Sequence, residues 1–129
     1  MIDQVLQTID ARRDKSIETL CDFLRIPSVS TQIEHKSDMH RCAEWLAKQI
    51  EGCGLKVEIA ATGGHPVVLA KNEHRSGRPT VLIYGHYDVQ PPEPLDLWKT
   101  PAFEPTIRKN EAGVDAVYAR GAVDDKGQV

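Results

Sequence analysis

The sequence of 129 residues has few cysteines, few aromatic residues and no excess of positive charge. Its three cysteines are an odd number at unrelated spacings, which excludes a disulfide framework and a Cys-x-x-Cys zinc motif. The 16 Lys and Arg residues against 19 Asp and Glu residues give a net charge of −3, so the basic surface typical of nucleic-acid binding is absent. No apolar run approaches the roughly 20 residues of a membrane-spanning helix, so we expect no membrane partner.

The N-terminus also lacks an export signal. Residues 1–5 (Met-Ile-Asp-Gln-Val) have neither a basic segment nor an apolar stretch, and we therefore predict a cytoplasmic protein. Hydrophobic residues make up 40% of the chain and charged residues 27%, as in ordinary soluble proteins. A chain of this size forms one domain at most, and aromatic residues at only 5% predict an aliphatic core.

Apolar residues recur at helical spacing in the first part of the chain. They predict one helix over residues 2–26, which Pro27 ends, and a second helix over residues 37–52. Ser37 or Asp38 is expected to cap the first turn of the second helix.

The hydrophobic pattern then changes to the alternation of β-strands. Residues 55–59 and 66–70 predict two strands joined by a turn at Gly63 and Gly64. Residues 80–84 (Thr-Val-Leu-Ile-Tyr) are almost continuously apolar, which is typical of a central strand buried on both faces. Residues 106–108 and 116–119 predict a short hairpin, and a further helix is expected to begin at residue 124 or 125. Together these elements predict an α/β fold, a layered mixed sheet flanked by helices and incomplete at its C-terminal end.

The first candidate site directly follows the predicted central strand, in Gly85-His86-Tyr87-Asp88. Residues i and i+2 of an extended chain point to the same side, so His86 and Asp88 should project together from the strand end where α/β proteins bind ligands. A histidine beside a carboxylate is typical of a zinc ligand, because one ring nitrogen binds the metal while the other donates to the carboxylate. A surface histidine and a capping aspartate would give the same pattern, so this motif alone leaves both interpretations open.

The second candidate site is Ala119-Arg-Gly-Ala-Val-Asp-Asp-Lys-Gly127. Gly121 permits a tight turn, and the adjacent carboxylates of Asp124 and Asp125 are favoured at the start of a helix. Ordinary helix capping would equally account for the two aspartates.

In combination, the two motifs resemble the dinuclear zinc peptidases related to carnosinase, bacterial dipeptidases, aminoacylase, acetylornithine deacetylase and succinyl-diaminopimelate desuccinylase. The order and spacing of further segments extend the resemblance from about residue 10 to residue 129. These segments are Phe-Leu-Arg-Ile-Pro-Ser-Val-Ser30, Asp-Leu-Trp98 and Phe-Glu-Pro105.

The resemblance implies a role for three residues. His86 would bind one zinc ion, Asp88 would act in catalysis by orienting His86, and Asp124 would bridge two zinc ions. The resemblance also implies a cis peptide bond after Asp124, and it gives Asp125 no role as a ligand. Residues 1–129 would form the N-terminal part of the catalytic domain. The general base, the other ligands and a lid and dimerisation domain would lie beyond residue 129.

The implied activity is zinc-dependent hydrolysis of the amide bond of a dipeptide or small amide substrate, by an enzyme that is a homodimer when complete. Residues 87–98 are more similar to the dipeptidases than to the deacylases. Because His86 and Asp124 are too few ligands for a stable zinc site, we expect the 129-residue chain alone to bind little zinc and to be inactive. Two alternatives remain open: a piece of an N-acyl amino acid amidohydrolase, or a shortened, non-catalytic protein that binds partners.

Overall fold

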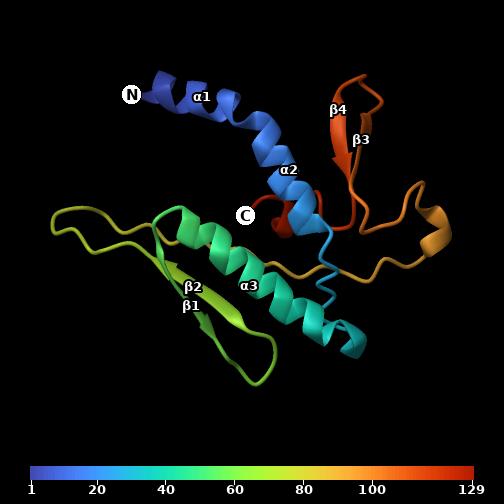
Figure 1. The fold of residues 1–129 in the computed structure, drawn as a ribbon, viewed down its shortest axis with the longest axis horizontal. Coiled ribbons are helices and arrows are strands. Elements are labelled where there is room, and N and C mark those ends of the chain that lie inside the picture. The colour runs from blue at the N-terminus through green and yellow to red at the C-terminus, as the bar shows by residue number, and fades with distance from the viewer.

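The computed structural model describes all 129 residues as three helices and two small sheets joined by long connections (Figure 1). The predicted α/β class is confirmed. No helix is long and apolar enough to span a membrane. The helices are α1 (Ile2–Ala11), α2 (Arg13–Leu24) and α3 (Lys36–Gly52), and the strands are β1 (Lys56–Ala60), β2 (Val67–Lys71), β3 (Thr106–Lys109) and β4 (Asp115–Tyr118). Short 3₁₀ turns occupy Ile33–His35, Leu95–Leu97 and Asp125–Gly127.

The single helix predicted over residues 2–26 is wrong, because the chain forms α1 and α2 with a break at Arg12. Arg12 has φ −102° and ψ 3°, outside the helical range. The apolar residues of α1 are 50% to 66% exposed, whereas the last turns of α2 are buried. Both segments are therefore helical, as the apolar spacing predicts, but only α2 packs against the rest of the molecule. No packing of α1 holds the two segments in one straight helix.

Helix α3 covers one face of the hairpin formed by β1 and β2 (Figure 1). Four residues of its predicted inner face are buried: Met39, Cys42, Ala43 and Ala47. The two strands pair antiparallel, as their alternating pattern predicts, and β3 and β4 form the second predicted hairpin.

The predicted cap of α3 is wrong. The helix begins at Lys36, and no side chain caps its first turn. The Asp38 carboxylate instead lies 2.7 Å from Nδ1 of His35 and 2.9 Å from the Arg41 guanidinium. The His35 ring and the Arg41 guanidinium thus engage the carboxylate that would otherwise accept from backbone N–H groups.

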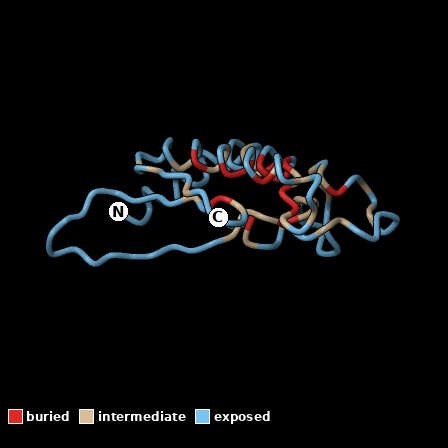
Figure 2. Tube along the Cα trace, turned by 90° about the horizontal axis from the view of Figure 1, so that it is seen from below, coloured by how far each residue is buried: buried red, intermediate tan, exposed pale blue.

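The central strand predicted over residues 80–84 is also absent. This segment forms no ladder with another strand, and the side chains from Val81 to Tyr84 are 79% to 91% exposed. It belongs to the long connection after β2 that extends away from both hairpins (Figures 1 and 2). A buried strand requires partners on both edges, and neither of the two-stranded sheets supplies one here.

The core lies where α2, α3 and the connection between them meet (Figure 2). Phe23 of α2 stacks on Trp45 of α3 with ring centroids 4.6 Å apart. Val29 forms an isolated parallel bridge with Val89, and the Val89 N–H donates to the Ser28 carbonyl at 2.9 Å. This bridge places the His86–Asp88 motif against the core.

Candidate metal centre

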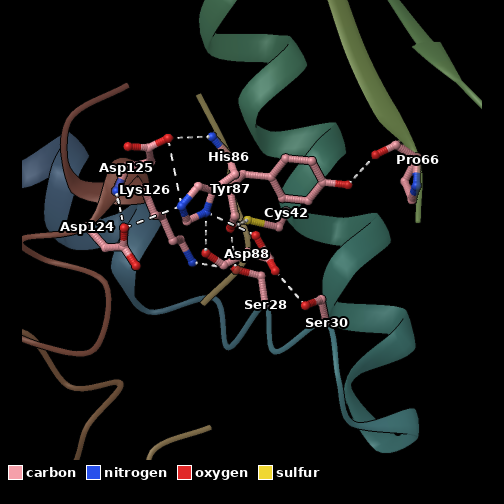
Figure 3. Close-up of polar contacts among 10 residues, drawn as sticks. All are labelled: Ser28, Ser30, Cys42, Pro66, His86, Tyr87, Asp88, Asp124, Asp125 and Lys126. Carbon is pink, nitrogen blue, oxygen red and sulfur yellow. Dashed lines mark hydrogen bonds and ion pairs between the residues drawn. The ribbon is translucent and has the colours of Figure 1, made fainter. Parts of the chain in front are cut away.

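The two motifs that stand far apart in the sequence meet in space (Figure 3). Nε2 of His86 lies 3.3 Å from Oδ1 of Asp124 and 3.7 Å from Oδ2 of Asp125. One potential ligand atom from each of these three residues lies within 4.8 Å of the others. The structure thus brings together the two residues predicted to bind metal, and it adds Asp125, which was expected to have no ligand role.

Asp88 lies on the opposite edge of the His86 ring. Nδ1 of His86 is 3.0 Å from the Asp88 carboxylate and 3.2 Å from the Asp88 carbonyl oxygen. The Ser30 hydroxyl donates to the other carboxylate oxygen of Asp88. Because Asp88 engages Nδ1, the other ring nitrogen, Nε2, faces Asp124 and Asp125. This is the arrangement expected when a carboxylate orients a histidine that binds metal.

The electrostatic environment of His86 favours positive charge. Partial burial lowers the pKa of His86, but the hydrogen bond to the Asp88 backbone and the carboxylates of Asp88, Asp125 and Asp124 outweigh it, so the pKa lies above its ordinary value. The same carboxylates that stabilise a proton on the imidazole also attract a metal cation.

The distances from Nε2 of His86 to the two carboxylates fit a small divalent cation. Donor atoms at 2.0–2.2 Å from a tetrahedral zinc ion are roughly 3.4 Å apart, close to the 3.3 Å and 3.7 Å measured from Nε2. Catalytic zinc sites take about three protein ligands from histidine and carboxylate side chains. All three side chains are between 37% and 52% exposed, which leaves the cluster open to solvent. One competing contact is present, because Oδ2 of Asp125 accepts the His86 backbone N–H at 3.2 Å.

The segment carrying Asp124 and Asp125 is a single 3₁₀ turn, so the helix predicted to start here is short. The Asp124 side chain accepts the Asp125 N–H at 2.9 Å, so the capping that the sequence left open is present as well. The expected cis bond between these two residues is wrong, because the chain's one cis peptide joins Glu93 and Pro94. A trans peptide bond is strongly favoured before any residue other than proline, and the bond between Asp124 and Asp125 is trans.

Gly127 is expected to be essential for this turn. A Cβ atom at Gly127 would lie 2.4 Å from the Ala122 carbonyl oxygen and 2.7 Å from that of Gly121, and both contacts are backbone. We expect Gly127→Ala to lower the free energy of unfolding by about 1–3 kcal/mol, typical of overpacking, and to displace the two aspartates. Thermal unfolding and amide chemical shifts measure the two effects.

The matched control for that variant is Gly63→Ala, because a Cβ at Gly63 meets nothing within 4 Å. Equal melting temperatures for Gly127→Ala and the unchanged chain would contradict the expectation.

The remaining histidines lie outside the cluster. His35 contacts Asp38, and Nε2 of His65 is 2.8 Å from the Ser30 carbonyl oxygen. Two residues that the sequence interpretation missed lie beneath the site: Ser28 and Lys126 are both fully buried. Their place in the sequence could have pointed to them, because Ser28 lies in the Ile-Pro-Ser-Val-Ser motif and Lys126 lies in the Asp-Asp-Lys-Gly motif.

Comparisons with known proteins find similarity along the whole chain. Residues 82–129 match the model of Peptidase family M20/M25/M40. The chain is 30% identical over 136 residues to the Cys-Gly metallodipeptidase dug1 of Schizosaccharomyces pombe, covering 98% of this chain and 28% of that protein. It is 31% identical over 113 residues to the succinyl-diaminopimelate desuccinylase of Xylella fastidiosa, covering 88% and 26% of the two proteins.

The fold is similar as well. Superposition on the crystal structure of human carnosine dipeptidase 1 gives a TM-score of 0.86 at 28% sequence identity, over 98% of this chain and 28% of the other. The resemblance predicted from the motifs is therefore confirmed in sequence and in fold. The chain spans between a quarter and a third of the length of these relatives.

Proposed function

Because residues 82–129 match peptidase family M20/M25/M40 and the chain has the fold of a section of a dipeptidase, we propose that it forms part of a zinc-dependent hydrolase of dipeptides. The observation that carries this proposal is the meeting of His86 with Asp124 and Asp125 at zinc-ligand spacing. Residues 1–129 are the N-terminal part of the catalytic domain in this proposal, and the complete enzyme is a cytoplasmic homodimer.

Each residue of the cluster has a defined task in the proposal. His86 binds zinc through Nε2, and Asp88 holds the ring by engaging Nδ1 at 3.0 Å. Asp124 and Asp125 would supply carboxylate oxygens to the metal, with Asp124 as the expected ligand and Asp125 as a further one. Bound zinc supplies an activated water at neutral pH and polarises the amide carbonyl.

A second candidate function is the hydrolysis of N-acyl amino acids. The similarity to a desuccinylase, at 31% identity over 113 residues, favours it. We place the dipeptidase first because the dipeptidase match covers 98% of the chain, against 88% for the desuccinylase. A non-catalytic protein that binds partners is the remaining alternative, and the test below addresses all three.

The test compares the 129-residue chain with the same chain extended through its natural reading frame. We expect only the extended protein to hold two zinc ions and to hydrolyse Cys-Gly or β-Ala-His. Complete four-ligand zinc sites bind with about 10–16 kcal/mol, so a three-ligand cluster in the short chain should bind zinc more weakly than about 1 μM. Metal analysis, calorimetric titration and detection of released amino acids measure these properties.

The outcomes separate the candidates. Release of succinate from N-succinyl substrates without dipeptide hydrolysis would favour the deacylase. A stop codon directly after Val129 and no hydrolysis would favour the non-catalytic protein. Tight zinc binding by the short chain would contradict the expected weakness of its site.

A further inference from the structure

Lys126 is the one charged residue whose side chain is completely buried. Its ammonium group donates to Oγ of Ser28 at 2.9 Å (Figure 3) and to the Ile26 carbonyl oxygen at 2.6 Å. None of the ion pairs in the structure includes Lys126. Burying an ammonium group without a carboxylate partner is unfavourable, and an apolar side chain such as Met would fill the same space without that cost. The ammonium group also lies 4.9 Å from the centroid of the Phe23 ring, a contact that offsets only part of this cost, so stability alone explains the lysine poorly.

Ser28 extends the contacts of Lys126 to the first motif. The Ser28 hydroxyl donates to the Tyr87 carbonyl oxygen at 2.7 Å while it accepts from Lys126. Tyr87 stands between His86 and Asp88, so this bond holds the backbone between the two site residues. The Ser28 carbonyl also accepts the Val89 N–H, which makes Ser28 a two-point support for this segment.

On its other side, Lys126 directly follows Asp124 and Asp125 in the chain. The path from Lys126 through Ser28 to Tyr87 therefore joins the two segments that carry the cluster. The direct polar contacts between these segments run from the His86 N–H and Nε2 to the carboxylates of Asp124 and Asp125, whose oxygens metal binding would also require. The buried path provides a connection that does not use a ligand atom.

We propose that Lys126 is a positioning residue that, through Ser28, holds the His86–Asp88 segment and the Asp124–Asp125 turn at metal-ligand spacing. The inference rests on the proposed function for its chemical purpose, and it assigns a task to the Ile-Pro-Ser-Val-Ser segment, which the proposed function leaves without one. Lys126 contacts neither substrate nor metal in this role.

The test is Lys126→Met in the purified chain, read in two ways. Without metal, we expect the His86 backbone N–H to exchange with solvent at least about 10-fold faster, while the amides of α3 keep their exchange rates. With Co²⁺ as the probe, we expect about 10-fold weaker binding, as for loss of a group that supports a metal ligand. The melting temperature is expected to hold or rise, because a lone buried charge has been removed.

Two controls make the test specific. Lys109→Met makes the same change at an exposed lysine paired with Asp115, and it should alter neither reading. Ser28→Ala should reproduce both effects, and the Lys126→Met, Ser28→Ala double variant should add little to either, because both act along one path. If Lys126→Met fails to fold, Ser28→Ala carries the test, with Ser37→Ala as its control.

The two readings distinguish failure of this proposal from failure of the proposed function. Faster His86 exchange, together with no Co²⁺ binding by the extended protein, would support the positioning role and contradict the metal site. Unchanged exchange and unchanged Co²⁺ binding in both variants would overturn the positioning role. A general fall in stability with faster exchange in α3 would also overturn it, in favour of a purely structural lysine.

Discussion

Replacing His86 by alanine is expected to abolish dipeptide hydrolysis by the extended protein. Nε2 of His86 is the one nitrogen in the cluster, and it lies 3.3 Å from Asp124. Without it, two carboxylates remain, and they hold zinc poorly because borderline-soft zinc favours nitrogen and sulfur ligands beside oxygen. A bound metal contributes several kcal/mol of transition-state stabilisation, so kcat/KM should fall at least about 1,000-fold. Dipeptide hydrolysis at matched zinc concentrations measures the loss.

His74→Ala is the matched control, because His74 is an exposed histidine that lies outside the cluster. It should leave both hydrolysis and metal content within the error of the unchanged protein. Wild-type activity in His86→Ala would refute the metal-binding role of this residue. Loss of activity in both variants would point to a general effect of removing histidine.

Leu24→Ala is expected to have the largest effect on stability. Leu24 is fully buried at the end of α2, and only 15 of 129 residues are buried, so the core has few other contacts to offset the loss. Truncation of a buried leucine costs about 2–5 kcal/mol, and the lower value alone corresponds to a fall of about 7 °C in melting temperature. Thermal unfolding followed by circular dichroism measures this change.

Leu97→Ala is the control for that variant. Leu97 is 76% exposed, so its truncation should change the free energy of unfolding by less than about 0.5 kcal/mol. Similar melting temperatures for Leu24→Ala and Leu97→Ala would mean that the core does not lie where α2 meets the Val29–Val89 bridge.

Local patterns were sufficient for the elements whose stabilising contacts are close in sequence. Helix α3 follows its apolar spacing, and each hairpin pairs strands separated by a short turn. The helical pattern over residues 2–26 predicted one continuous helix, and the apolar run over residues 80–84 predicted a central strand. Neither formed, because a helix face and a central strand also need partners that are distant in sequence. The exposed apolar side chains of α1 and of residues 81–84 show that those partners are absent from the described chain.

The sequence by itself was sufficient to predict the resemblance to zinc peptidases. His86, Asp88 and Asp124 taken alone left a structural interpretation open, and the metal site was implied by the resemblance that the two motifs carry together with the segments around them. Only the tertiary structure decided that Asp125 joins the cluster, and that Lys126 and Ser28 connect its two halves. Asp125 and His86 are 39 positions apart, and Lys126 and Ser28 are 98 positions apart. Local propensity and periodicity carry no information at these ranges.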